Sequence, residues 1–327
     1  MSTLSKSPLA VARAALAVGQ KTLRAYSHRY SPHTYTQPQL FACLVLKTFF
    51  RTDYRGIEAI LQDSGDLCDA LDLFFVPHFT TLQKASARLL RQPRARRLFR
   101  RTVRLSYGRR RRLRRAALDS TGLEYGQRSS YYVRRRNSST KHWQTVAYSR
   151  FAKLEAAIDC ANHFLLAVLV GRGPRPDINR FVPLLDATLA QVRPATVLAD
   201  AGYDSEANHC HARERRAVRS FMPAKHGRPT SKLPSGRHRR RMKQRLNKHY
   251  GGYGQRWQVE TGFSMIKRRI SNLVRAHTYG NQRRELLLIA LTYNIMLLCA
   301  AAAFLQSNPR PLFRLAPTFT RTKSSPV

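Results

Sequence analysis

The sequence predicts a mixed α/β fold, with a mixed sheet flanked by helices and a small all-α domain before it. Three observations support this prediction. Short apolar runs that end in Asp119 and Asp200 have the length of buried strands. Between them, residues 153–170 have the pattern of two strands joined by a tight turn near Asn162. Before residue 94, by contrast, apolar residues recur at helical spacing.

The composition indicates a globular protein that binds a polyanion. The 327 residues are 43% hydrophobic, which is enough for a real core. The formal charge is +41, from 59 basic and 18 acidic residues. A chain this cationic repels itself unless a polyanion neutralises it, so nucleic acid is the favoured partner. A membrane surface or an acidic protein is the alternative on charge alone.

The five cysteines are odd in number, scattered, and free of any C-x-x-C pair. This usage favours a reducing compartment, and we expect a cytoplasmic, nucleoid-associated protein. The run His209-Cys210-His211 places three possible metal ligands next to one another in the sequence. Consecutive side chains on a helix point about 100° apart, so we expect these three residues not to share one ion.

Residues 1–93 predict a helical N-terminal DNA-binding domain. Its first 30 residues suit a helix or a loose arm, and Pro38 suits the first turn of a second helix. Further helices are expected over 54–61 and 82–90, the last with Thr80 or Thr81 as its N-cap. Small helices separated by tight turns are typical of helix-turn-helix readers of DNA. A plain helical bundle that supports the rest of the chain would show the same pattern.

Residues 94–115 contain twelve arginines and no acid. Arginine-rich segments favour phosphate binding, and we expect this one to be a linker between two domains. The next segment, A-A-L-D-S-T-G-L, predicts a strand that ends at Asp119, with residues 120–122 in a turn. Asp177 is expected to cap a helix, and T-V-L-A-D predicts a strand that ends at Asp200.

The stretch Tyr253–Lys267 predicts a helix with one polar and one apolar stripe of side chains. At about 100° per residue, four polar side chains share one face and four apolar ones share the next. The polar stripe is Tyr253, Arg256, Glu260 and Lys267, and the apolar stripe is Val259, Phe263, Ile266 and Ile270. An ordinary Glu–Arg pair on a solvated helix would also fit this spacing.

The pattern Y-x-x-R-x-x-x-E-x-x-x-x-x-x-K over residues 253–267 resembles the signature of bacterial insertion-sequence DDE transposases of the Y-R-E-K branch. L-D-S-T at Asp119 and A-D-A-G-Y-D at Asp200 resemble the first and second acidic motifs of that family. The resemblance implies a ribonuclease-H-like catalytic domain over residues 116–305. It also implies that Asp119, Asp200 and Glu260 are the catalytic, metal-binding acids.

The same resemblance implies a DNA transposase that cleaves at element ends and transfers the 3′-hydroxyl to target DNA. Tyr253, Arg256 and Lys267 would contact DNA near the cut. The implied cofactor is a pair of Mg²⁺ ions, with Mn²⁺ able to substitute, because three carboxylates suit hard cations. The implied partner is double-stranded DNA, both the terminal inverted repeats and the target, bound by a homodimer and away from membranes.

Several alternatives stay open at this point. Glu124 competes with Asp119 as the first ligand, whereas Asp204 and Glu206 suit the cap and first turn of a helix. A nuclease without strand transfer, or a retired transposase that only binds DNA, would keep the fold. A basic structural protein of the nucleoid or ribosome would have no reason to hold three acids.

Two further segments carry expectations. Residues 213–248 form a basic insertion with fourteen lysines and arginines, which we expect to lack a core and to order on DNA. Residues 286–305 are uncharged and long enough to cross a membrane, but they suit a buried core helix equally well. The tail, 306–327, is expected to be disordered.

Overall fold

The computed structural model describes residues 4–108, 111–125, 151–173, 175–225, 232–247 and 249–307. Of the tail that we expected to be disordered, residues 306 and 307 belong to the last helix, and the rest lies outside the described residues.

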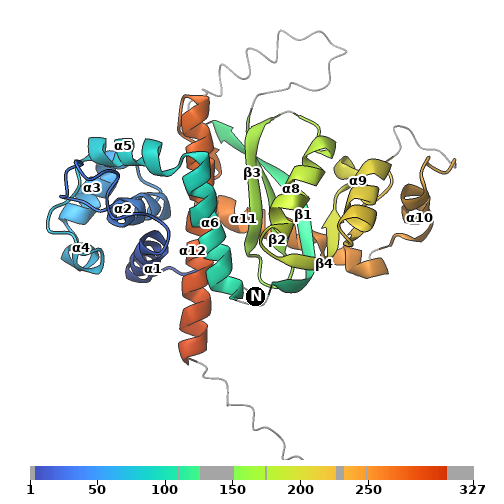
Figure 1. The fold of residues 1–327 in the computed structure, drawn as a ribbon, viewed down its shortest axis with the longest axis horizontal. Coiled ribbons are helices and arrows are strands. Elements are labelled where there is room, and N and C mark those ends of the chain that lie inside the picture. The colour runs from blue at the N-terminus through green and yellow to red at the C-terminus, as the bar shows by residue number, and fades with distance from the viewer. Residues whose placement is uncertain are drawn as a thin grey trace, which may run out of the picture.

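Five helices form the N-terminal region, on one side of the long last helix (Figure 1). They are α1 (Pro8–Gln20), α2 (Gln37–Phe49), α3 (Tyr54–Gln62), α4 (Gly65–Ala70) and α5 (Phe79–Leu89). Thr36 begins α2 in a capping box with Gln39, and the side chain of Asp53 caps α3. The predicted N-cap of α5 was wrong. His78 is the N-cap, and its ring accepts the Thr80 N–H, so neither threonine has that role.

The arginine-rich stretch 94–115 differs from the expected linker. Most of it belongs to α6 (Gln92–Tyr107), and residues 112–115 begin the first strand. Apolar side chains at helical spacing explain this helix, since Leu98, Phe99 and Val103 are buried. The helix packs against the last helix of the chain, which places most of its arginines on the opposite, outward side.

A six-stranded mixed sheet forms the centre of the molecule. Its order is β3-β2-β1-β4-β5, with β6 paired to the far end of β1. The strands are β1 (Arg112–Tyr125), β2 (Phe151–Asp159), β3 (Leu165–Gly173), β4 (Arg193–Ala199), β5 (Arg219–Phe221) and β6 (Leu273–Val274). The first three are antiparallel neighbours, whereas β4 and β6 run parallel to β1 and β5 runs parallel to β4. The predicted mixed α/β architecture is confirmed, and so is the tight turn between β2 and β3.

Strand β1 does not end at Asp119 as the sequence suggested. Residues 120–122, which we expected to form a turn, continue the strand and pair with β2, where Ser120 lies opposite Glu155. Strand β4, however, ends at Ala199, which is opposite Leu118. Asp119 therefore lies where β1 passes the end of its parallel neighbour.

Helices cover both faces of this sheet (Figure 1). On one face lie η1 (Ile178–Arg180) and α8 (Phe181–Leu189). On the other lie α11 (Gln258–Arg269), which follows the 3₁₀ segment η4 (Tyr250–Trp257), and α12 (Tyr279–Ser307). Alternating residues of β2 show this division, since Glu155 bonds Arg180 of η1 whereas Ile158 touches α11 at Gly262.

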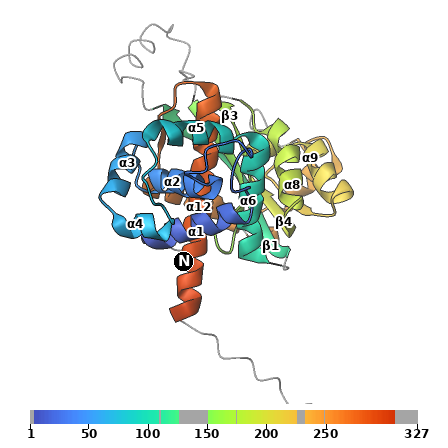
Figure 2. The same cartoon turned by 60° about the vertical axis from the view of Figure 1, so that its left-hand side comes forward.

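Helix α12 is the one helix in the described chain long and apolar enough to cross a membrane. Within the protein, 72% of that apolar stretch is buried, against the sheet and against α1, α2 and α6. Figure 2 shows it passing behind α1 and α2. Its central polar groups have partners, since Asn294 bonds both backbone groups of Leu165 and the Tyr293 hydroxyl donates to the His163 carbonyl. These contacts agree with the interpretation as a core helix.

The basic insertion 213–248 is more ordered than we expected. Residues 219–221 form β5 at the edge of the sheet, and α10 (Arg237–Arg245) packs against α9 (Glu206–Cys210). The prediction that this stretch lacks a core was wrong for these parts, because Phe221 and Met242 are buried. Residues 226–231 and 248 lie outside the described part of the chain.

Candidate active site

The register of β1 and β4 places Asp119 and Asp200 side by side. Leu118 pairs with Ala199, and each aspartate is the next residue on its chain. Because neighbouring strands lie about 4.8 Å apart, the two carboxylates meet at the same edge of the sheet. Asp200 is exposed and directly follows β4, which ends one residue earlier than predicted, whereas the Asp119 side chain is only 19% exposed. The Ser120 N–H donates to Asp119 Oδ1 at 2.7 Å and fixes its orientation.

Helix α11 brings Glu260 to the same edge. The helix packs closely on β2, where a Cβ on Gly262 would meet the Ile158 side chain at 2.6 Å. Glu260 is 56% exposed, and Arg256 Nη2 lies 2.6 Å from its Oε1. The same guanidinium lies 3.4 Å from Asp119 Oδ2. Arg256 therefore bridges the first and third acids, and it supplies the positive charge that neighbouring carboxylates require.

The polar stripe is not one continuous α-helix. Tyr253 and Arg256 lie on η4, which is kinked at Gly251 and Gly252, where φ is +65° and +76°. Arg115 of β1 holds this turn through the Gly251 carbonyl, at 3.2 Å. The Tyr253 hydroxyl donates to the carbonyl of Ala199, at 3.4 Å, at the end of β4.

The apolar stripe of the same stretch behaves as predicted. All four of its side chains face the core, namely Val259, Phe263, Ile266 and Ile270. Lys267, by contrast, does not join the acids. It lines a groove between α11 and the N-terminal helices, together with Lys47, Arg51 and Arg275.

The carboxyl of Asp119 has an unusual pKa. Burial raises its pKa to about 6, and the neighbouring charges of Asp200 and Asp177 act in the same direction. The Ser120 N–H and the Arg256 guanidinium oppose this rise. Burial likewise raises the pKa of the Tyr253 hydroxyl to about 12. The edge of the sheet is thus crowded with negative charge, a setting in which a bound cation is stabilised.

Sequence reasoning missed a network of charged residues behind these acids. Lys153 Nζ lies 2.5 Å from Asp177 Oδ1, and Arg180 Nε lies 2.6 Å from Glu155 Oε2. Asp177 provides no side-chain cap, contrary to expectation, because its carboxylate is engaged by Lys153. Lys153 and Glu155 are both buried on β2. In the sequence, these two charged residues alternate with apolar ones in the segment K-L-E-A-A-I, and this pattern could have indicated a buried ion-pair network.

Several other candidates occupy different positions. Glu124 is an odd number of residues along β1 from Asp119, which places it on the opposite face of the strand. Asp204 caps no helix, since it is buried and accepts from Arg239 and the Lys225 N–H, while Ser205 caps α9. Trp257, which follows Arg256 in the chain, is 54% exposed.

The three acids form an oxygen-only set, which is the type of ligand that Mg²⁺ and similar hard cations prefer. Arg256, placed between two of the carboxylates, holds a position where positive charge is needed. The donor types therefore suit a divalent metal centre at one sheet edge and one helix. With Arg256 between two of them, however, the three carboxylates do not all lie within 4.8 Å of one another, so they must draw together to share an ion.

Comparison with known families gives one clear result. Residues 110–295 match the family model described as the transposase DDE domain, which is more than half of the chain. A comparison with curated proteins finds no match. The matched span contains β1, β4 and α11, the three elements that carry Asp119, Asp200 and Glu260, and the chain belongs to the DDE transposase family.

Proposed function

We propose that the protein is an insertion-sequence transposase of the Y-R-E-K branch, which cleaves DNA at the element's ends and joins the freed 3′-hydroxyl to target DNA. Family membership gives a transposase that acts on DNA with divalent metal ions. The reaction steps and the branch are the proposal. One observation carries it: Arg256 spans Asp119 and Glu260, while the strand register sets Asp200 beside Asp119.

Asp119, Asp200 and Glu260 are the residues that would hold two Mg²⁺ ions, for which Mn²⁺ would substitute. When bound, such ions supply activation of a water or 3′-hydroxyl and stabilisation of the leaving oxygen. Asp119 and Asp200 contribute rigid positions, because both follow paired strand residues. Glu260 is more exposed and lies on a helix, so it can adjust its position when the substrate enters.

Arg256 and Tyr253 contact the phosphate backbone in this proposal. When the carboxylates bind metal ions, the guanidinium is released from them. It can then donate two parallel hydrogen bonds to the oxygens of one phosphate group. Trp257 is exposed next to Arg256 and is placed to stack on a base that has left the duplex. Lys267, in its groove beside α2, would bind DNA that passes between the helical region and the catalytic domain.

The rest of the chain supplies the basic surface. Helices α6 and α10 both present rows of arginine, which suit DNA flanking the cut. Helices α2 to α5 would read the terminal inverted repeats. We propose that the active form is a homodimer on DNA, in the cytoplasm at the nucleoid.

A plasmid assay tests the proposal. The full chain is incubated with Mg²⁺ and a supercoiled plasmid that carries the DNA flanking its own coding sequence. We expect breaks at both element ends and products joined to target DNA, and no products with Asp119→Asn.

Other outcomes identify the alternatives. Breaks without any joined product indicate a nuclease that lacks strand transfer. Tight binding of the flanking DNA without breaks, in Mg²⁺ and in Mn²⁺, indicates a retired transposase. Equal binding to any DNA, with no cleavage, indicates a structural protein.

A further inference from the structure

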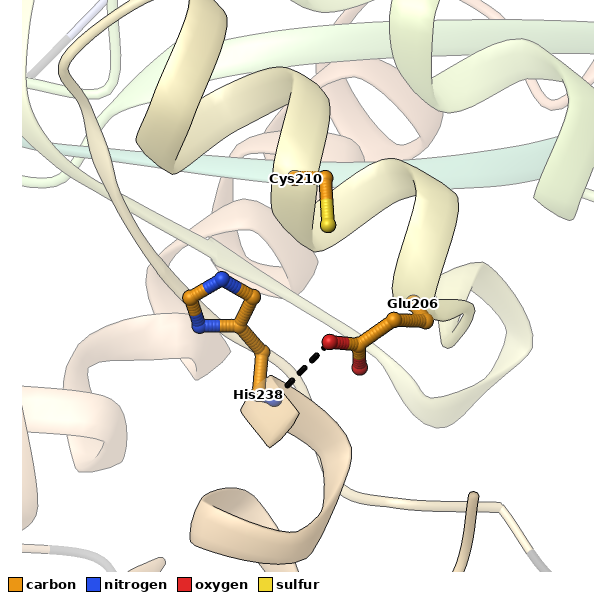
Figure 3. A group of neighbouring side chains, drawn as sticks. All are labelled: Glu206, Cys210 and His238. Atoms are coloured by element: carbon orange, nitrogen blue, oxygen red, sulfur yellow. Dashed lines mark hydrogen bonds between the residues drawn. The ribbon is translucent and has the colours of Figure 1, made fainter. Parts of the chain in front are cut away.

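A second group of metal-ligating side chains lies on α9 and α10, away from the three acids. Glu206 and Cys210 are four residues apart and therefore share a face of α9. His238 approaches from the first turn of α10 (Figure 3). The ligating atoms of these three residues all lie within 4.8 Å of one another, and they are the one such group among the described residues.

A fourth possible ligand contacts this group through His238. Glu214 lies four residues beyond Cys210, on the π-helical turn that continues α9. Its Oε1 is 2.9 Å from His238 Nε2. A thiol, an imidazole and two carboxylates thus converge from two helices.

The run His209-Cys210-His211 behaves as its spacing predicted. His209 Nδ1 contacts the Ser220 hydroxyl at 2.8 Å, and His211 Nε2 contacts Asp186 at 3.0 Å. The His209 ring also packs beside the His238 ring, with centroids 6.0 Å apart, but of the three residues only Cys210 has its ligand atom in the group with Glu206 and His238. The relevant cluster therefore combines one residue of that run with partners distant in sequence.

We propose that Cys210, His238, Glu206 and Glu214 bind one zinc ion. Zn²⁺ accepts sulfur, imidazole nitrogen and carboxylate oxygen in a tetrahedral arrangement, whereas Mg²⁺ avoids sulfur and nitrogen. Zinc bonds of about 2.0–2.3 Å put neighbouring ligand atoms roughly 3.5 Å apart. The ligand atoms of Glu206, Cys210 and His238 already lie within 4.8 Å of one another and reach this spacing by small side-chain rotations. Glu214 would join through the carboxylate that now contacts His238.

The backbone contacts of Glu206 are compatible with zinc binding. Its two oxygens accept the N–H groups of His238 and Arg239, at 3.0 and 3.1 Å, and so cap the start of α10. A carboxylate has about four lone-pair sites, so it can cap the helix and bind a metal together. The cap also brings the His238 ring to the cluster before any metal arrives.

The zinc ion would fix the position of α10, a helix that we propose binds DNA, against α9. Helix α10 carries six arginines and lysines in nine residues, and of its side chains only His238 and Met242 are buried. With so little apolar contact, its position depends on polar anchors at its first turn. A metal shared by α9 and α10 would hold the basic face of α10 in one orientation for DNA.

Cobalt substitution tests this site directly. The full chain, freed of metal, is titrated with Co²⁺, and absorption from thiolate-to-cobalt charge transfer is recorded. We expect one equivalent to produce the band, zinc to displace it, and Cys210→Ser to abolish it. Cys68→Ser is the matched control, because Cys68 is also partly exposed but lies in the N-terminal region. We expect that variant to keep the band in full.

Two results would overturn the proposal: no band in the wild-type chain, or a band that survives Cys210→Ser. His238→Gln should weaken zinc binding tenfold or more, and circular dichroism establishes whether each variant is folded. Hydrogen exchange gives a second measurement, in which zinc slows exchange over residues 237–245 in the wild type but not in Cys210→Ser. The variant Asp119→Asn should keep both responses, so failure of the transposase proposal and failure of the zinc proposal are distinguishable.

Discussion

The edge of the sheet and the α9–α10 cluster both gather acidic side chains, but by different means. At the sheet edge, strand register sets Asp119 beside Asp200, and a packed helix adds Glu260. In the cluster, helical spacing aligns Glu206 with Cys210, and one residue of another helix completes the group. The first set contains only oxygen and the second contains sulfur and nitrogen. Ligand type therefore separates a centre for hard cations from a centre for zinc.

The two regions also differ in their anchors. Behind the sheet edge, Lys153 is 6% exposed and pairs with Asp177. Beside the cluster, the buried Asp204 pairs with Arg239 of α10, which is 20% exposed. In the first pair the cation is the deeper member, since Asp177 is 25% exposed, whereas in the second pair the anion is, since Asp204 is 0% exposed.

The largest expected effect concerns the acids. Replacing Asp119, Asp200 or Glu260 by Ala should lower Mg²⁺-dependent cleavage by a thousandfold or more, which corresponds to about 4 kcal/mol or more of transition-state stabilisation. DNA binding should be kept or slightly strengthened, because a repulsive charge is lost. Cleavage and filter-binding assays measure the two effects. Glu124→Ala is the control, and loss of cleavage there with retention in Asp119→Ala would show that Glu124 is the first ligand.

The next effect concerns the anchors. Lys153→Met leaves Asp177 without its partner and removes a positive charge near Glu155, so it should lower the free energy of unfolding by about 3–5 kcal/mol. Arg239→Met should cost less, because Arg239 is more exposed and Asp204 keeps the Lys225 N–H. Urea denaturation measures both variants. Equal losses would mean that the Lys225 N–H does not compensate Asp204 for the lost guanidinium.

A smaller effect concerns pH. The folded pKa of Asp119, about 6, is above its usual value of 3.8. Between these values the folded state binds more protons than the unfolded state, so stability is lost as pH rises from 3.8 to 6. Asp119→Asn removes the buried charge, and it should stabilise the metal-free protein by about 1–3 kcal/mol at pH 7. Urea denaturation from pH 4 to 7.5 measures the gain, and a gain independent of pH would exclude ionisation as its cause.

The smallest effect concerns DNA affinity, compared between an aromatic residue near the sheet edge and one elsewhere on the surface. Trp257→Ala should weaken binding of single-stranded or melted DNA by about 1 kcal/mol or a little more, through loss of one stacked base. Phe74→Ala is the control, since Phe74 is more exposed but lies in the N-terminal region. Fluorescence anisotropy measures both affinities. Equal weakening in the two variants would mean that Trp257 has no specific role.

The sequence predicted the features that local patterns determine. Alternation and apolar runs gave the β2–β3 pair and β4 with Asp200 at its end. Helical spacing gave the buried stripe of α11, because a helix amid a core must bury one face. The four-residue separation of Arg256 and Glu260 was enough to bring them into contact, even though Arg256 lies just before α11 begins.

Tertiary structure decided the features that depend on residues distant in the chain. The sequence could not show that β1 continues past Asp119, because the hydrogen bonds that extend it come from β2. It could not show that Asp177 pairs with Lys153 instead of capping a helix, nor that His238 lies beside Cys210. Side-chain spacing along a chain gives direction only within one helix or strand, whereas pairing between elements requires the packed core that brings them together.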